Sequence, residues 1–151
     1  LDGSSGVDPT AWFAGLDIAA LVADLRAQVG AFEYNVALQR IWLEVLDAAN
    51  RYIDATAPFK LARTDLDACK AVLINLAEAI RVIAILIKPF LPGTAETFYR
   101  AFNFEEGRAW DQIGYVDALS RSGGLELEVT APLVGGKPAP LFPKIEVKET
   151  P

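Results

Sequence analysis

Apolar residues recur at steps of three and four along most of the first hundred positions, with charged residues between them. This spacing is typical of helices that bury one face against a core. The helices predicted in this way cover residues 16–30, 32–56, 66–88 and 94–102. Asp17 and Asp65 stand where the first and third helices need an N-cap, and Pro58 stands where the second must end.

The helix predicted over residues 66–88 is apolar around most of its circumference, which is typical of a helix in the middle of a bundle. Its most apolar run, residues 82–87, is far shorter than the roughly 20 residues that a membrane span needs. We therefore expect a buried core helix and no membrane span.

The pattern changes after residue 104. Residues 107–119 are irregular, and we expect Trp110, Ile113 and Tyr115 to anchor them on the bundle. This part of the chain is therefore predicted to be ordered by a few large side chains and not by a helical face.

The last part of the chain has the composition of an extended segment. Residues 125–129 alternate apolar and acidic side chains, as in a strand or an extended stretch. Glycines and prolines follow, and Leu141-Phe142-Pro143 is typical of a peptide that docks its two large side chains.

The sequence therefore predicts an all-α fold, an antiparallel helical bundle with an extended, non-helical C-terminal tail. Its three segments are an irregular N-terminal segment (1–15), the helical bundle (16–104) and a tail that packs back on the body (105–151). In the first segment, Gly3-Ser4-Ser5-Gly6 is either a native loop or a cloning remnant. We expect a piece of a longer protein, because the chain holds no methionine and begins at Leu1.

Composition narrows the classes of function. The 151 residues make about one domain, and 52% hydrophobic with 23% charged residues is a globular composition. The mean hydropathy of +0.26 is high for a free-standing domain, so we expect apolar surface that packs on another body. The net charge of −6 argues against nucleic-acid binding, although local clusters of Lys and Arg decide the affinity for phosphates.

Catalytic chemistry has few candidates in this chain. There is no histidine and Cys69 is the single cysteine, so His-based catalysis, His metal sites, zinc motifs and disulfides are excluded, and a reduced, cytoplasmic setting fits. We find no glycine-rich phosphate loop. The acidic residues fall on predicted solvent faces without forming an acid–base couple. We therefore predict no catalysis, cofactor or metal within this chain.

The corner after Pro58 carries the most informative residues. Phe59 is either an aromatic packed into the corner, which the residues alone favour, or an exposed platform for an unpaired base. Arg51, Lys60, Arg63 and Lys70 gather near it, and cations beside an aromatic ring are what recognition of single-stranded RNA uses. Structural salt bridges remain the alternative for these cations.

Three polar or aromatic residues precede that corner on the helix over residues 32–56. Trp42 and Tyr52 lie on its apolar stripe, so we predict core positions, with a hydrogen-bonded hydroxyl for Tyr52. Asn50 lies beside the stripe. We predict a polar anchor to a neighbouring segment there, with a ligand contact as the alternative.

Several of these motifs together resemble the helical anticodon-binding domain of the methionyl-tRNA synthetases. The resemblance covers about residues 32–146. The matching segments are ALQRI (37–41), NRYID (50–54), APFKLA (57–62), IKPFLPGTAE (87–96) and LFPKIE (141–146). The spacing from NRYID to the Pro-aromatic pair, together with the terminal LFPK, makes the match specific.

The resemblance implies a binding site at the corner. In that family the aromatic after the proline is usually tryptophan and stacks on an anticodon base; Phe59 keeps the stacking face but has less ring area and no indole N–H. It implies tRNA contacts for Phe59, and backbone or phosphate contacts for Arg51, Lys60 and Arg63, with Asn50 as a further candidate. The family's other main anticodon readers lie on a helix upstream, and no residue here corresponds to them.

The resemblance also implies a parent enzyme that ligates methionine to its tRNA. ATP and a metal ion would be bound by a catalytic part outside this chain, and the chain's partners would be the tRNA anticodon loop and the catalytic domain of the same polypeptide. Two alternatives stay open. One is the corresponding domain of another class I synthetase, for cysteine, valine or leucine, and the other is a helical protein–protein module without RNA binding.

Overall fold

The computed structural model describes residues 11–102, 104, 108–119, 133–134 and 137–138. Its first part comprises η1 (Ala11–Phe13), α1 (Ile18–Gly30), α2 (Tyr34–Arg40), η2 (Ile41–Leu46), α3 (Asp47–Thr56) and α4 (Pro58–Thr64). Its second part comprises α5 (Leu66–Ile87), α6 (Pro92–Ala101), η3 (Trp110–Gln112), η4 (Tyr115–Ala118), β1 (Leu133–Val134) and β2 (Lys137–Pro138).

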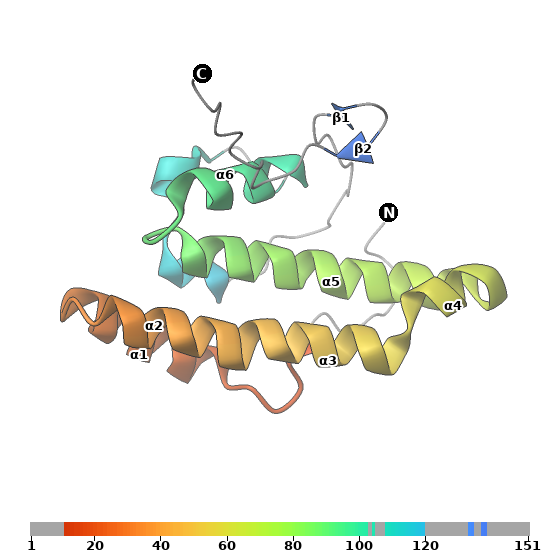
Figure 1. The fold of residues 1–151 in the computed structure, drawn as a ribbon, viewed down its shortest axis with the longest axis horizontal. Coiled ribbons are helices and arrows are strands. Elements are labelled where there is room, and N and C mark those ends of the chain that lie inside the picture. The colour runs from red at the N-terminus through yellow and green to blue at the C-terminus, as the bar shows by residue number, and fades with distance from the viewer. Residues whose placement is uncertain (1–10, 103, 105–107, 120–132, 135–136, 139–151) are drawn as a thin grey trace, which may run out of the picture.

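The helices form an antiparallel bundle around α5 (Figure 1). α2, η2 and α3 run on as one rod, α1 lies back along α2, and α6 lies on the other side of α5. Thirteen residues of α5 are buried, which fits the helix predicted to lie in the middle of the bundle. The all-α bundle predicted from the apolar spacing is therefore confirmed.

The helix boundaries follow the local chemistry that the sequence shows. Asp17 accepts a hydrogen bond from the Ala20 N–H at 3.0 Å, and Asp65 does the same for Ala68 at 3.0 Å, so both N-caps are as predicted. α3 ends two residues before Pro58, and Pro58 is the first residue of α4. A backbone N–H at that position would have no partner within the helix, so the missing N–H of proline costs nothing there.

One prediction on the long rod is wrong. Trp42 was expected in the core, but it is 47% exposed, and Leu43 beside it is 63% exposed. The cause is η2, a turn of π-helix, whose wider turn takes an extra residue and shifts the apolar stripe. Ile41 and Val45 stay fully buried, while Trp42 and Leu43 face outward.

A buried ion pair in α5 corrects the expectation that all acidic side chains face solvent. Glu78 is 6% exposed and Arg81 is 2% exposed. The Arg81 guanidinium donates to both carboxylate oxygens of Glu78, at 2.7 and 2.9 Å, and to the Asp117 carbonyl oxygen at 2.9 Å. Paired and hydrogen-bonded in this way, two charges can be tolerated inside the bundle.

The segment over residues 108–119 packs on α5 as predicted. Trp110 and Ile113 are 7% and 5% exposed, and the half-buried Tyr115 donates its hydroxyl hydrogen to the Leu86 carbonyl at 2.9 Å. Toward the other terminus, Trp12 is 2% exposed and belongs to the core.

Further along, β1 and β2 pair as a two-residue antiparallel ladder. The strand predicted over residues 125–129 and the docking tripeptide 141–143 lie outside the described residues, as do residues 1–10. The boundaries drawn at residues 15 and 104 stay predictions.

Candidate nucleic-acid interface

The corner between α3 and α4 is made by one residue in a left-handed conformation. Ala57 has φ 44° and ψ 59°. Its N–H donates to the Ile53 carbonyl at 2.8 Å, and its own carbonyl accepts from the Lys60 N–H at 2.8 Å. Ala57 thus closes α3 and opens α4, and the chain changes direction within a single residue.

This turn presents Phe59 to solvent. Its side chain is 65% exposed, and the Lys60 ammonium lies 6.0 Å from the centre of its ring. The packed corner that the residues alone favour is therefore wrong. The reason is the entry of the chain into α4, where the half-buried Pro58 and Leu61 lie against the bundle and leave Phe59 on the free side.

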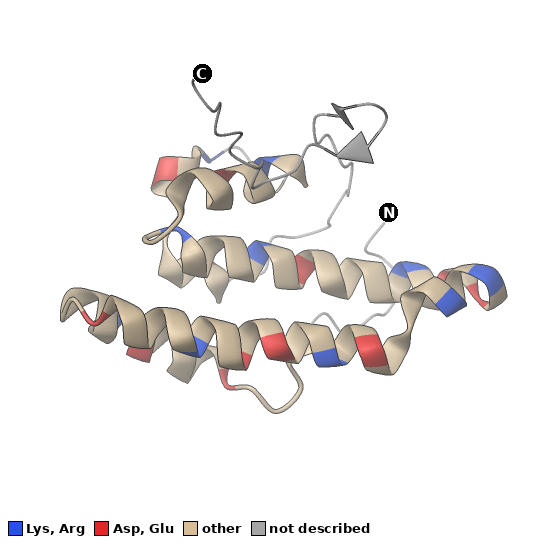
Figure 2. Cartoon of the chain, viewed as in Figure 1, with Lys and Arg blue, Asp and Glu red and all other residues tan. Residues whose placement is uncertain are grey.

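The cations predicted near Phe59 divide into two groups (Figure 2). Lys60 and Arg63 are exposed on α4, the same short helix that carries the aromatic ring. Arg51 lies on α3, where its guanidinium pairs with Asp47 at 2.5 Å, and Lys70 pairs with Asp67 at 3.3 Å. The structural salt bridge kept as an alternative is thus present for Arg51 and Lys70, although both side chains remain exposed.

The polar anchor is a different asparagine from the one predicted. Asn50 is exposed, so it is not packed beneath a neighbouring segment. Asn75 on α5 is 2% exposed, and its amide donates to the Tyr52 hydroxyl oxygen at 2.9 Å. The hydrogen-bonded tip predicted for Tyr52 is confirmed. The signal that could have identified Asn75 is a lone amide within an otherwise apolar stretch of helix.

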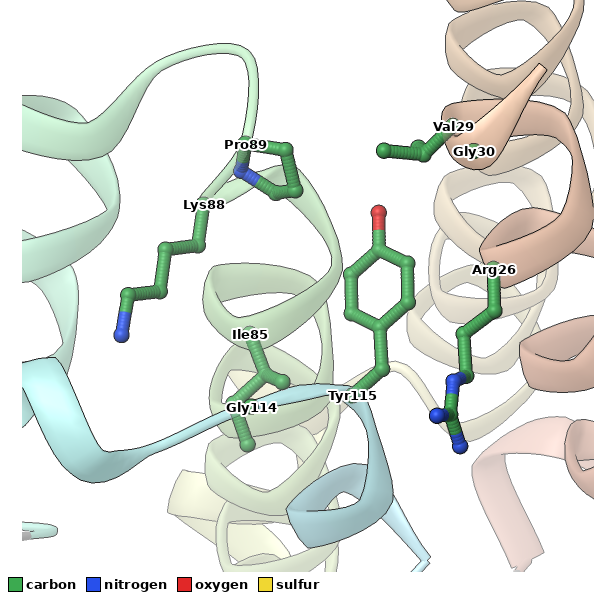
Figure 3. A pocket seen from close by; sticks show the side chains of 8 residues that line it. All are labelled: Arg26, Val29, Gly30, Ile85, Lys88, Pro89, Gly114 and Tyr115. Carbon is green, nitrogen blue, oxygen red and sulfur yellow. The ribbon is translucent and has the colours of Figure 1, made fainter.

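A pocket lies near the C-terminal end of α5, the end away from this corner (Figure 3). The pocket has a volume of about 380 Å³. Its lining consists of Arg26, Val29, Gly30, Ile85, Lys88, Pro89, Gly114 and Tyr115.

The chemistry of this pocket is mainly apolar. The Lys88 side chain points away from the Tyr115 ring in Figure 3, and its ammonium donates to the Trp110 and Ile113 carbonyls. Burial raises the pKa of Tyr115 to about 12, so that hydroxyl stays neutral near pH 7. The lining offers no acid–base pair for catalysis.

The described residues also bear on two other classes of site, metal centres and membrane spans. No group of three or more acidic or Cys side chains in this part of the chain lies close enough together to hold a metal ion. None of the helices described is both long and apolar enough to cross a membrane. ATP and a metal ion in a catalytic part outside this chain stay predictions.

The fold and the corner together define an all-α domain that offers an exposed aromatic ring beside cations. Comparison with known families identifies it further: the family described as the anticodon binding domain of methionyl tRNA ligase matches residues 6–148, and the chain belongs to this family. None of the solved structures compared with the chain matches it significantly.

Relatives with curated names agree with this family. The methionine–tRNA ligase of Lactococcus lactis subsp. lactis (strain IL1403) is 35% identical over 135 residues, 85% of this chain and 18% of that protein. The ligase of Bacillus subtilis (strain 168) is 33% identical over 121 residues, 78% of this chain and 16% of that protein. The ligase of Streptococcus pneumoniae serotype 4 is 31% identical over 130 residues, 85% of this chain and 18% of that protein.

Two conclusions follow from these relatives. The methionine enzyme is favoured over the cysteine, valine and leucine synthetases that the sequence left open. The chain spans less than a fifth of the length of the relatives described here.

Proposed function

We propose that the chain binds the anticodon loop of a tRNA at the α3–α4 corner, where Phe59 stacks on an unpaired base. The observation that carries this proposal is the 65% exposure of a large apolar ring beside Lys60. Stacking of an aromatic ring on an unpaired base is worth roughly 1–3 kcal/mol. α4, the helix that carries Phe59, lies at an end of the bundle, where a loop of RNA can reach it (Figure 1).

Lys60 and Arg63 have the role of holding the RNA backbone. Both are exposed on α4, so their charges can approach phosphates that flank the stacked base. Arg51 can join them from α3 when it exchanges its exposed pair with Asp47 for a phosphate, since exposed pairs contribute little to stability. Asn50, exposed on the same helix, is a further candidate for hydrogen bonds to the loop.

The net charge of −6 sets the conditions of this binding. Local cations attract the loop while the rest of the surface repels it, so specificity must come from the stacked base and not from charge alone. Affinity is expected to fall as salt rises, with a shallow slope because few phosphates are neutralised.

The parent protein that we propose is a methionine–tRNA ligase, which joins methionine to its tRNA with ATP. In that protein this chain would hold the anticodon end of the tRNA. ATP and a metal ion would bind in the catalytic domain of the same polypeptide, in the cytoplasm.

The test is binding of two anticodon stem-loops, one with CAU and one with a scrambled anticodon, at low and moderate salt. We expect preference for CAU, and a 5- to 150-fold loss of that binding in Phe59→Ala, which is 1–3 kcal/mol converted at 25 °C. Phe32→Ala is the matched control, because Phe32 is also a highly exposed phenylalanine, at 78%, but lies in the turn between α1 and α2.

Since the family's other anticodon readers would lie upstream, the same measurement is made on the chain extended by the preceding helix of its parent protein. Equal, feeble binding of both loops by the extended protein would overturn the proposal. The chain would then be a helical module that packs on other proteins.

A further inference from the structure

We propose that Asn75 is a positioning residue for the stacking platform: through the Tyr52 hydroxyl it fixes the joint that holds Phe59 out into solvent. This inference rests on the proposed function of Phe59. Asn75 lies on α5, outside the residues that would touch RNA, and acts through α3.

The first step concerns the low intrinsic stability of α4. Every residue of this seven-residue helix is either exposed or half-buried, with Pro58 and Leu61 as its half-buried apolar side chains. A helix of this length is not stable by itself in water, and packing normally decides where such a helix lies. The direction of α4, and with it the direction of the Phe59 ring, is therefore set from outside the helix, by its joint to α3 and by its packing on α5.

The second step concerns the joint. Ala57 is in the left-handed region, which costs a non-glycine residue about 1–2 kcal/mol. Such a conformation persists only where the surrounding structure holds it. Its N–H bonds the Ile53 carbonyl and the Thr56 hydroxyl donates to the Tyr52 carbonyl at 2.6 Å, so the joint is built directly on the last turn of α3.

The third step concerns what holds that last turn. Tyr52 is half-buried, and its hydroxyl oxygen accepts a hydrogen bond from the Asn75 amide at 2.9 Å. On the other side of the joint, the Cys69 thiol donates to the Pro58 carbonyl at 3.5 Å. Asn75 and Cys69 are six residues apart on α5, about 9 Å along the helix. α5 therefore ties down the chain both before and after Ala57.

The tie at Tyr52 is the stronger of the two. Asn75 is 2% exposed. The oxygen of its side-chain amide, Oδ1, is also buried and has no hydrogen-bond partner among the described residues. Without the Tyr52 hydroxyl the whole amide would lack a partner, which is more costly than the loss of an ordinary hydrogen bond. A thiol is only a weak donor. Loss of the hydrogen bond to Tyr52 should therefore disturb the joint more than loss of the bond from Cys69.

The experiment removes only the hydroxyl, in Tyr52→Phe. Its matched control is Tyr115→Phe, which removes a tyrosine hydroxyl that is also half-buried and also bonded at 2.9 Å, at the other end of α5. Amide hydrogen exchange is measured for α4, including the Lys60, Leu61 and Asp65 N–H groups that are bonded in the structure. We expect at least fivefold faster exchange across α4 in Tyr52→Phe, and unchanged exchange across α4 in Tyr115→Phe.

A double variant separates position from stability. Tyr52→Phe with Asn75→Leu removes both polar partners, so its thermal stability should recover toward that of the original chain. If the bond positions the joint, exchange in α4 stays fast and binding of the CAU stem-loop stays three- to tenfold weaker despite this recovery. If the bond only adds stability, exchange in α4 and binding of the CAU stem-loop both return to the values of the original chain as stability recovers, and the inference is wrong.

The outcomes also separate this inference from the proposed function. Unchanged exchange in α4 of Tyr52→Phe overturns the inference whatever the RNA does. Loss of binding in Phe59→Ala with normal binding in Tyr52→Phe keeps the proposed function and overturns the positioning role. Faster exchange in α4 with no effect of Phe59→Ala on binding keeps the tie between Asn75 and the joint, and removes the function for which we propose it.

Discussion

An aromatic ring lies beside a lysine near each end of α5, and the two pairs have opposite roles. Near its first residue, the ring of Phe59 is 65% exposed and the Lys60 ammonium lies 6.0 Å from its centre. Just past its last residue, the Lys88 ammonium lies 4.4 Å from the centre of the Trp110 ring, which is 7% exposed.

The difference lies in what else the lysine can reach. Lys88 donates to two backbone carbonyls, those of Trp110 and Ile113, at 2.5 and 2.6 Å. Its charge is thus used to hold the segment over residues 108–119 on the bundle, and burial lowers its pKa. Lys60 is exposed on α4, a helix in which no residue is fully buried. The comparison teaches that an aromatic–lysine pair indicates a binding site only when neither partner is already used by the fold.

The largest expected effect separates the two rings. Trp110→Ala is expected to lower the free energy of unfolding by about 3–5 kcal/mol, because it empties a buried site in the core. Phe59→Ala should change it by less than about 0.5 kcal/mol, as for other exposed positions. Urea unfolding of both variants measures this. A strongly destabilised Phe59→Ala would mean that the ring is part of the core and not a platform.

A smaller effect separates the two lysines. Lys88→Met keeps most of the side-chain volume but leaves two carbonyls without their donor, so we expect a loss of about 2 kcal/mol in the free energy of unfolding. Lys60→Met is the matched substitution at the exposed pair. It should leave stability unchanged and weaken stem-loop binding mainly at low salt. Equal losses of stability in the two variants would contradict the comparison.

The joint before Phe59 offers an effect of about 1 kcal/mol with opposite signs at two alanines. Ala57→Gly should raise the free energy of unfolding by about that amount, because glycine adopts the left-handed conformation without a steric penalty. Ala62→Gly, at an exposed position within α4, should lower it by roughly 0.5–1 kcal/mol. Thermal unfolding of the pair checks both signs, and a destabilised Ala57→Gly would argue against the left-handed joint.

The smallest expected effect concerns stability at acidic pH, at the end of α5 where Lys88 and Trp110 lie. The Arg108 guanidinium, 2.6 Å from Asp117, holds the pKa of that carboxyl below its usual range. A folded-state pKa below the unfolded one adds stability above the unfolded pKa, and this stability is lost as pH falls through the folded pKa. Asp117→Asn keeps an acceptor for the Gly114 N–H but not the charge. Its unfolding free energy should fall less steeply than that of the original chain below about pH 4.

The parts of the fold that follow from neighbours in the chain were predictable. Apolar spacing placed the long helices, Asp17 and Asp65 were identified as caps, and Pro58 marked the end of α3. The hydrogen-bonded hydroxyl of Tyr52 followed from its place on the stripe near a helix end. In the corner, the residues alone gave Phe59 and its cations as candidates but favoured burial of the ring.

The misses have two causes, a local irregularity of the helix and contacts between residues that lie far apart in the chain. The exposure of Trp42 comes from the π turn of η2, which shifts the apolar stripe. The burial of the Glu78–Arg81 pair depends on the Asp117 carbonyl, which lies 36 positions after Arg81 and accepts from its guanidinium. Asn50 was expected to be the anchor, but Asn75 has that role, because Asn75 faces Tyr52 from the neighbouring helix α5.

The sequence by itself determined the helical class, the caps at Asp17 and Asp65, the end of α3 and, through its resemblance, the family to which the chain belongs, but it did not show α4 as a helix. These depend on local backbone preferences and on short motifs, which are complete within a few neighbouring residues. Only the tertiary structure decided that Phe59 is free while Trp110 is enclosed, and that Lys60 faces solvent while Lys88 is bonded to carbonyls. Exposure is a property of everything that packs around a side chain, and that packing brings together segments that are distant in the chain.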